Sequence, residues 1–457
     1  MNAPRARTAK SSLLWTRWQS VVRRNPAAIA VIEVETGRDW SRAELHAAAI
    51  RLSDDPLAPA AGHEVAFSLP NGAEWMTVFL ALQRIGATAI PLDPSLTAKQ
   101  QDALAATLRL RFVWRAGGLH PTSAPRRVAR IAALGKLTSG STGVPRVILC
   151  AAAHLIADGT HIVRTMRIRS SDRNLALIPL GHSYGLGNLV APLLLQGTPV
   201  VCARAFVPQQ VPLWIKQYRV SVLPTVPAVL RLLATLPGRA RLGPLRLVIS
   251  AGARLPPETT RDFAARFGLP VHNFYGSSET GGICYDRRAS PSATGESVGT
   301  ALTGVDVSLT SRGRVRVSSE AVAAGRAGAF TLPDFGRLNA RGELEVLGRA
   351  GRVANLGGRN LHPREIENQL AQMPGVSDAW VQVLAKSGRD YLVAAVETSR
   401  PSDEIITEFS HLVAAWQRPR FWLVLPRLPR TDRGKLDSPA LRARLEAANP
   451  TPRDARG

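Results

Sequence analysis

Cysteine is rare in this sequence, and long apolar segments are absent. The 457 residues contain three cysteines, Cys150, Cys202 and Cys284, and none lies in a Cys-x-x-Cys or Cys/His metal-binding spacing. An odd count at such wide spacing excludes a disulfide framework and fits a reducing compartment. No apolar run approaches the roughly 20 residues that a membrane-spanning helix needs. We therefore expect a cytoplasmic protein without a membrane span.

Lysine is also scarce, although the chain is strongly basic. Only six of the 58 basic residues are lysines, and the formal net charge is +24. A charge of this size is typical of proteins that bind nucleic acids, but the arginines are spread along the whole chain and no DNA- or RNA-recognition motif accompanies them. We interpret the charge as a compositional bias that favours anionic ligands, and we expect no nucleic-acid partner.

The hydrophobic pattern predicts an α/β protein with two domains. Residues 25–115 and 172–250 alternate short apolar segments with helix-like segments, which indicates α/β architecture. Beyond residue 295, alternating residues over 305–317 and the run 342–347 predict short antiparallel strands. We expect a large, multi-subdomain N-terminal domain over residues 1–348 and a small, mobile α+β domain over residues 349–457. Glycines at the joint give the backbone freedom that a hinge can use.

The most informative segment is residues 138–146, Thr-Ser-Gly-Ser-Thr-Gly-Val-Pro-Arg. Its glycines and hydroxyl side chains have little to bury, so backbone N–H groups can approach a polyanion closely, and Arg146 adds charge. Apolar flanks at residues 128–134 and 147–150 predict a strand on each side, whereas the common P-loop connects a strand to a helix. A phosphate-binding loop and a polar hairpin without a ligand both fit this composition.

Three further segments are equally ambiguous when each is taken alone. They are Asn273-Phe274-Tyr275-Gly276-Ser277-Ser278-Glu279, Phe330-Thr331-Leu332-Pro333-Asp334, and Pro429-Arg430-Thr431-Asp432-Arg433-Gly434-Lys435. In this order, and together with the loop at 138–146, they resemble the adenylate-forming superfamily, which includes acyl- and aryl-CoA synthetases, luciferases and the adenylation domains of peptide synthetases. The resemblance extends from about residue 25 to about residue 437.

The resemblance implies a nucleotide site. Its ATP-binding residues would be Thr138, Ser139, Gly140, Ser141, Thr142, Gly143 and Arg146 at the β- and γ-phosphates, Gly252, Ala253, Arg254, Tyr275 and Gly276 around the adenine, Ser278 at the α-phosphate, and Asp334 and Arg349 at the ribose. Glu279 would hold Mg²⁺, and Lys435 would be the catalytic lysine. Arg146 replaces the family's usual lysine, and Leu332-Pro333 replace Thr-Gly.

The implied activity is ATP-dependent activation of a carboxylic acid, fatty or aromatic, followed by transfer to a thiol. Mg²⁺ and a lysine would stabilise the negative charge that builds on the phosphorus oxygens when the carboxylate attacks. Coenzyme A is the expected acceptor, and the phosphopantetheine arm of an acyl carrier protein is the alternative. Gly358 matches the glycine beside the pantetheine thiol, whereas Gly351 and Asn355 replace charged residues that are usual near the hinge.

One segment also fits a different class of enzyme. Gly181-His182-Ser183-Tyr184-Gly185 has the G-x-S-x-G spacing of an α/β-hydrolase nucleophile elbow, with Ser183 as nucleophile and His272 or His362 as base. The same segment matches the Pro-x-x-His-Ser-Tyr-Gly pattern of the adenylate-forming family, in which His182 lies at the acyl pocket. We favour the second interpretation. Asp334-Phe335-Gly336 spells the kinase metal motif, but no other kinase motif accompanies it.

Overall fold

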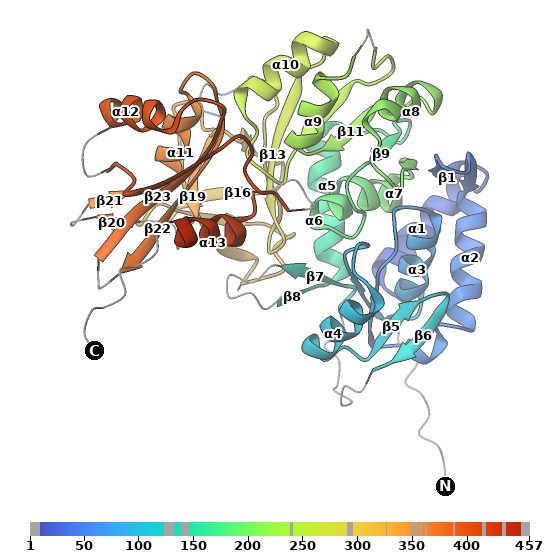
Figure 1. Ribbon diagram of the computed structural model, residues 1–457. Coiled ribbons are helices and arrows are strands. Elements are labelled where there is room, and N and C mark those ends of the chain that lie inside the picture. The colour runs from blue at the N-terminus through green and yellow to red at the C-terminus, as the bar shows by residue number, and fades with distance from the viewer. Residues whose placement is uncertain are drawn as a thin grey trace. The chain divides into compact units, whose positions relative to one another are not determined.

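The computed structural model describes residues 10–122, 132–138, 146–237, 241–289, 296–325, 327–349, 354–356, 359–361, 363–386, 389–413, 417–431 and 436–448. The chain divides into two compact units (Figure 1). The first comprises residues 1–308, 316–331 and 342–344, and the second comprises residues 309–315, 332–341 and 345–457. The α/β class expected from the sequence is confirmed. The expected boundary after residue 348 stays a prediction.

The first unit contains a nine-stranded sheet in the order β15-β14-β13-β12-β11-β9-β10-β1-β2. Its strands are β1 (Ile29–Glu33), β2 (Arg38–Ser41), β9 (Asn174–Ala176), β10 (Val200–Cys202), β11 (Val222–Thr225), β12 (Leu247–Ser250), β13 (Val271–Ser277), β14 (Gly281–Tyr285) and β15 (Thr300–Ala301). Six neighbouring strands of this sheet are parallel to one another: β13, β12, β11, β9, β10 and β1. Every residue of β11 and β12 is buried, as in a sheet covered on both faces.

A second sheet of the first unit has six strands in the order β6-β5-β3-β4-β7-β8. They are β3 (Glu64–Phe67), β4 (Thr88–Pro91), β5 (Phe112–Arg115), β6 (Gly118–Pro121), β7 (Leu134–Thr138) and β8 (Arg146–Cys150). The strands β7 and β8 are antiparallel, and Thr138 pairs with Arg146 where the intervening loop begins and ends. A strand therefore lies on each side of the loop, as predicted, but the first strand is residues 134–138 and not 128–134. Between Thr138 and Arg146 the loop lies outside the described segments.

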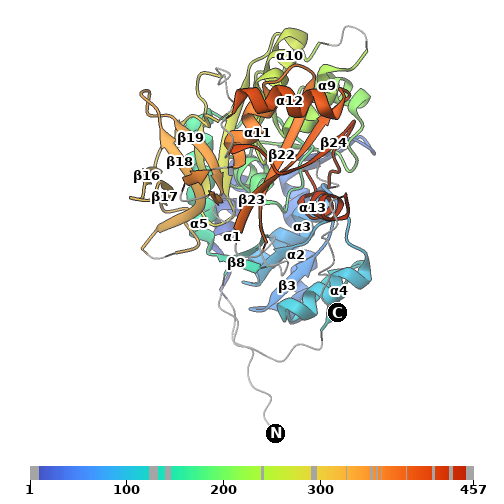
Figure 2. The same cartoon turned by 60° about the vertical axis from the view of Figure 1, so that its left-hand side comes forward.

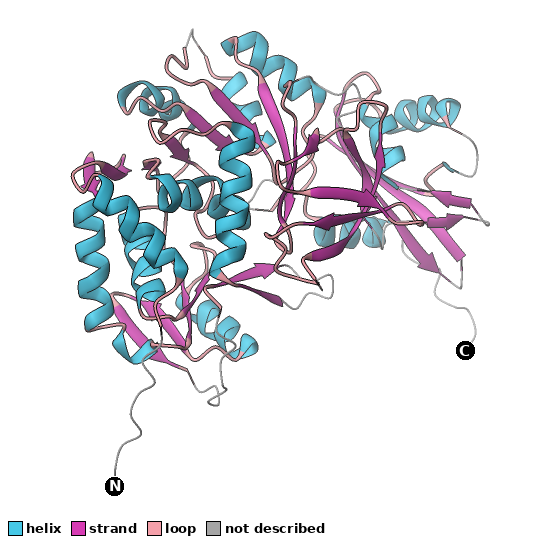
Figure 3. Ribbon diagram, turned by 180° about the vertical axis from the view of Figure 1, so that it is seen from behind, coloured by secondary structure: helices cyan, strands magenta, loops and turns pink. Residues whose placement is uncertain are grey.

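Helices cover both sheets of the first unit (Figure 3). They are α1 (Leu13–Arg24), α2 (Arg42–Asp54), α3 (Ala73–Arg84), α4 (Ala98–Leu108), α5 (Ala152–Met166), α6 (Ser183–Gly185), α7 (Ala191–Gln196), α8 (Val211–Gln217), α9 (Pro227–Ala234) and α10 (Pro257–Phe267), with the short turns η1 (Ala58–Ala60), η2 (Leu186–Val190) and η3 (Pro208–Gln210). Helix α5 contacts β14 of the nine-stranded sheet and β8 of the six-stranded sheet, so it lies against both sheets. Among the described residues, no helix has both the length and the apolar composition that crossing a membrane requires.

The second unit is built on a three-stranded sheet of β22 (Val376–Lys386), β23 (Arg389–Thr398) and β24 (Phe421–Leu425). Side chains alternate between its two faces: Val381 packs with α11 (Pro363–Ala371) and α12 (Ser402–Leu412), and Trp380 packs with α13 (Ser438–Ala448). Figure 2 shows α12 and α13 beside this sheet. The strands β20 (Ala354–Leu356) and β21 (Arg359–Leu361) form a separate ribbon.

The unit boundary passes through a four-stranded sheet in the order β16-β17-β18-β19, formed by β16 (Asp306–Leu309), β17 (Arg314–Ser318), β18 (Ala329–Leu338) and β19 (Leu344–Arg349). These strands confirm the short strands predicted after residue 295. In β17, Val315 and Val317 are buried and Arg316 between them is exposed. This alternation has the period of two that is typical of a strand.

All three cysteines are free thiols buried in the first unit. Burial raises the pKa of Cys284 to about 12 and also raises those of Cys150 and Cys202. Because the thiolate is the reactive form, the native protein should not react with DTNB within minutes, whereas all three thiols should react in denaturant. A thiol that reacts rapidly in the native protein would contradict this burial.

Candidate active site

The predicted nucleotide-binding segments of the first unit follow the carboxyl ends of its parallel strands. Thr225, the last residue of β11, pairs with Ser250, the last residue of β12. Ser250 pairs in turn with Asn273 in the middle of β13, so the carboxyl ends of β11 and β12 lie beside the middle of β13. Gly252-Ala253-Arg254 follow β12, and Tyr275 to Glu279 occupy the end of β13 and the turn after it. Ligands of open α/β sheets bind at this edge. The fold therefore brings together two segments that the sequence separates by about 20 residues.

Gly252 and Tyr275 lie at the surface of this edge. Gly252 has a φ of +81°, so the chain leaves β12 in a conformation that side-chain-bearing residues rarely adopt. Gly252 and Ala253 are exposed, and Arg254 and Tyr275 are half-buried. The antiparallel pairing of β13 with β14 has a register shift between Tyr275 and Gly276. The aromatic ring is thus placed at a surface from which it can stack on a planar base.

Tyr184 connects the ends of three strands, and sequence analysis assigned it no role. Its hydroxyl donates a hydrogen bond to the Ile249 carbonyl at 3.0 Å and accepts one from the Thr225 N–H at 3.2 Å. Its ring packs against Phe274, with the ring centroids 5.7 Å apart. Burial raises the pKa of Tyr184 well above its ordinary value, so the phenol stays protonated and keeps donating. Tyr184 therefore fixes the edge on which the predicted adenine-binding segments lie.

His182 directly precedes helix α6, and Ser183 is the first residue of that helix. The Ser183 Oγ is 2.8 Å from the Oγ of Ser278, the residue predicted at the α-phosphate. The His182 Nε2 lies 3.7 Å from an oxygen of Asp93, a residue that follows β4, which is beyond hydrogen-bonding distance. The contact between Ser183 and Ser278 thus joins the predicted acyl and phosphate segments.

The hydrolase interpretation finds no support in this arrangement. Among the described residues, the side chain that hydrogen-bonds Ser183 is another hydroxyl and not an imidazole. The Nδ1 of His272, one of the two proposed bases, is 2.8 Å from the Asp286 carbonyl, and its ring stacks on Tyr285. His362, the other proposed base, lies outside the described residues. A nucleophilic serine needs a base within hydrogen-bonding reach.

Replacing Ser183 by alanine should therefore leave acid-dependent pyrophosphate release within about fivefold of the unchanged protein, because a neutral hydrogen bond contributes about 1 kcal/mol. Ester hydrolysis should be absent from both proteins. Loss of an esterase activity in the variant would restore the hydrolase interpretation.

The turn that carries Ser278 and Glu279 is held at several points. The Ser277 Oγ accepts a hydrogen bond from the Thr280 N–H at 3.3 Å. The Glu279 carbonyl accepts hydrogen bonds from the N–H groups of Ala323 at 2.9 Å and Ala324 at 3.2 Å. These contacts fix the backbone of the residue predicted to bind the metal.

Glu279 fits a divalent cation. Its side chain is half-buried, and none of the hydrogen bonds or ion pairs among the described residues engages its carboxylate. The described residues contain no group of three or more metal-binding side chains. A cation at Glu279 would therefore take most of its ligands from water or nucleotide. Mg²⁺ is bound in this way at many phosphate sites, by one or two carboxylates and substrate phosphates.

The other predicted residues lie in the second unit, at the two ends of the loop at 138–146, or outside the described segments. Asp334 is half-buried in β18, and Arg349 ends β19. Thr138 ends β7 and exposed Arg146 begins β8. Ser139, Gly140, Ser141, Thr142 and Gly143 of the loop, together with Gly351, Gly358 and Lys435, fall outside the described residues.

The base of the segment that carries Lys435 is nevertheless described. Arg430 and Leu436 form an antiparallel bridge, and the Asp437 N–H donates to the Pro429 carbonyl at 2.9 Å. The Arg430 guanidinium is 2.7 Å from a carboxylate oxygen of Asp378 and 3.2 Å from one of Glu397. The two ends of this segment are therefore held together on the three-stranded sheet of the second unit.

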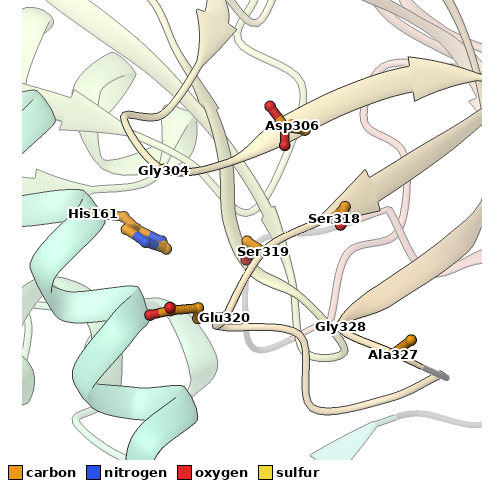
Figure 4. Close-up of a pocket in the computed structure, with 8 residues that line it drawn as sticks. All are labelled: His161, Gly304, Asp306, Ser318, Ser319, Glu320, Ala327 and Gly328. Carbon is orange, nitrogen blue, oxygen red and sulfur yellow. The ribbon is translucent and has the colours of Figure 1, made fainter.

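A separate hollow of about 550 Å³ lies in the first unit (Figure 4). It is lined by His161, Gly304, Asp306, Ser318, Ser319, Glu320, Ala327 and Gly328. None of these residues was predicted to bind the nucleotide. Because the carboxylates of Asp306 and Glu320 repel phosphate, this hollow does not suit ATP.

Comparisons with known proteins identify the family of this chain. The family model described as AMP-binding enzyme matches residues 18–129 and 132–320. The medium-chain fatty-acid–CoA ligase of Escherichia coli is 25% identical over 93% of this chain and 89% of that protein. A feruloyl-CoA synthase of Amycolatopsis is 27% identical over 93% of this chain and 97% of that protein.

The fold has a matching solved structure. The O-succinylbenzoate coenzyme A synthetase (MenE) of Bacillus subtilis, in complex with ATP and magnesium ion, superposes with a TM-score of 0.79. The match covers 94% of this chain and 99% of that chain, at 22% identity. The family match, on a chain with this fold, defines an adenylate-forming enzyme. The chain belongs to the AMP-binding enzyme family, as the resemblance of its four motifs implied.

Proposed function

We propose that this enzyme is an AMP-forming acid–thiol ligase that joins a carboxylic acid to coenzyme A. The observation that carries the proposal is the family match over residues 18–129 and 132–320, which includes the segments that meet at the ends of β11, β12 and β13. Relatives that span most of the chain are CoA ligases for a fatty acid and for an aromatic acid. Both kinds of acid therefore remain candidate substrates.

In the first half-reaction the substrate carboxylate attacks the α-phosphorus of ATP and pyrophosphate leaves. Tyr275 and Gly252-Ala253-Arg254 hold the adenine, Asp334 and Arg349 the ribose, and residues 138–146 the β- and γ-phosphates. Ser278, placed by its contact with Ser183, meets the α-phosphate. When bound at Glu279, Mg²⁺ supplies positive charge against the phosphate oxygens. Lys435 adds a compact positive charge as the transition state forms.

In the second half-reaction a thiol attacks the acyl carbonyl and AMP leaves. Gly358 allows the pantetheine chain to approach, and His182, whose Nε2 is 3.7 Å from Asp93, lies at the entrance of the acyl pocket. Glycine at position 351 allows the rotation that the family uses between half-reactions. Coenzyme A is the proposed acceptor because the full-length relatives named above use it; the carrier-protein arm carries the same pantetheine thiol. The three reduced thiols fit a cytoplasmic location.

A panel of fatty and aromatic acids, assayed for pyrophosphate release with ATP and Mg²⁺, tests the proposal. Release should require a carboxylic acid, and adding coenzyme A should convert the adenylate to a thioester that mass spectrometry identifies. A parallel reaction with a holo acyl carrier protein distinguishes the two acceptors. Acid-independent ATP hydrolysis, or no turnover with any acid, would overturn the proposal.

A further inference from the structure

We propose that Asp158, on helix α5, is a positioning residue for the turn that carries Ser278 and Glu279, and that it thereby sets the affinity for the divalent cation. This inference rests on the proposed function, because it assigns the cation to Glu279. Asp158 lies outside all four motifs, and it reaches the turn from a different part of the chain.

Asp158 contacts the end of the turn directly. Its side chain is buried, and its Oδ1 accepts a hydrogen bond from the Gly282 N–H at 2.8 Å. Gly281 packs on the carboxylate so closely that a Cβ there would lie 2.6 Å from the Asp158 Cγ. Gly281 also has a φ of +73°, where residues with side chains are strained. The chain therefore leaves Glu279 and Thr280 through a glycine that fits against this carboxylate.

The same carboxylate faces the strand that leads into the predicted phosphate loop. Burial raises the pKa of Asp158, and the positive charge of Lys136 and the Gly282 N–H oppose that effect. Lys136 is buried in β7, two residues before Thr138, and the ring of His161, one turn further along α5, also interacts with Asp158. A buried carboxylate thus interacts electrostatically with the stem of the phosphate loop and accepts a hydrogen bond from the end of the turn that carries Glu279.

The position of the Glu279 carboxylate follows from these contacts. Residues 277–282 are held by Ser183 at Ser278, by Ala323 and Ala324 at the Glu279 carbonyl, and by Asp158 at Gly282. Removing the Asp158 side chain would leave the Gly282 N–H buried without this acceptor and open space beside Gly281. Partners behind a metal ligand commonly change metal affinity by 10- to 100-fold. Loosening one end of so short a turn should act in the same way.

The test measures Mn²⁺ binding by electron paramagnetic resonance in the presence of α,β-methylene-ATP, which reports the cation without turnover. In D158A the dissociation constant should rise about tenfold, whereas D158N, which keeps an oxygen acceptor for Gly282, should stay within about threefold of the unchanged protein. In the pyrophosphate-release assay, D158A should need a higher Mg²⁺ concentration than D158N and the unchanged protein.

Asp172 provides a matched control. It is also a buried aspartate of the first unit, and it accepts hydrogen bonds from Ser221 at 2.8 Å and from the Arg169 N–H at 2.7 Å and pairs with Arg246. However, it precedes β9 and so lies at the amino ends of the parallel strands, opposite the site. D172N should lower the melting temperature and leave Mn²⁺ affinity unchanged.

The outcomes separate the two proposals. If the unchanged protein binds no Mn²⁺ with the nucleotide analogue, the proposed metal and nucleotide site fails. If it binds Mn²⁺ and D158A binds equally well, or D172N weakens binding as much as D158A, only the role of Asp158 is overturned. Should D158A fail to fold, Gly281→Ala tests the same contact from the other side. An unchanged Mn²⁺ affinity in a folded Gly281→Ala protein would also contradict the role.

Discussion

Replacing Lys435 by alanine should lower acid-dependent adenylate formation by about 10²- to 10³-fold, the usual effect of removing one group that stabilises a developing charge. The enzyme should still convert supplied acyl-AMP and coenzyme A to the thioester, because that step adds no charge to phosphorus. The chain has 58 basic residues and only six lysines, so arginine would be the more common basic residue at any position. The lysine that follows Gly434 therefore stands out. Pyrophosphate release and thioester formation, measured separately, check both halves of the prediction.

The control for Lys435 is Lys216, which is exposed on helix α8 in the first unit. Lys216→Ala removes the same charge from the protein and should change neither half-reaction. Lys435→Arg keeps the charge but replaces a compact ammonium by a planar guanidinium, so it should restore little adenylation. Equal loss of both half-reactions in Lys435→Ala, or loss of neither, would contradict the assigned role.

Replacing Glu279 by glutamine should raise the Mg²⁺ concentration for half-maximal pyrophosphate release at least about tenfold and lower the saturated rate by about 100-fold. The amide keeps the size of the side chain but loses the charge that attracts the cation. Among the described residues no cation competes for this carboxylate, so the loss should appear as weaker Mg²⁺ binding and not as lower stability. A Mg²⁺ titration together with a thermal melt separates the two effects.

Glu258→Gln is the matched control for Glu279→Gln. Glu258 is exposed in the first turn of helix α10, where its loss should cost only a little helix stability. The Mg²⁺ requirement should be unchanged in this variant. A Glu279→Gln enzyme with an unchanged Mg²⁺ requirement would show that the cation is held elsewhere.

Local patterns in the sequence were sufficient to predict much of the fold. Helix α3, Ala73–Arg84, is one of the helices that the alternation over residues 25–115 predicts, because its apolar period is clear and Gly86 follows it. The hairpin β7–β8 was predicted because β-branched and apolar residues flank a polar, glycine-rich loop. Strand β11, Val222–Thr225, was not predicted, because Pro224 lacks an N–H and proline normally argues against a central strand.

The site could be predicted only where one segment carries a complete motif. Tyr275, Ser278 and Glu279 were recognised together because they are neighbours in sequence. Tyr184 and Asp158 were not, since their partners come from distant segments: Thr225 and Ile249 for the first, Gly282 and Lys136 for the second. The motif at residues 181–185 includes Tyr184 but does not show which strands its hydroxyl joins, and no motif marks Asp158.

A crystal structure with ATP and Mg²⁺ tests the nucleotide site most directly. The adenine should stack on Tyr275 beside Gly252-Ala253-Arg254, the metal should contact Glu279, and the terminal phosphates should lie along residues 138–146. Nucleotide bound instead in the hollow lined by His161 and Glu320, or absent from a crystal grown at saturating ATP, would contradict the site and the activity derived from it.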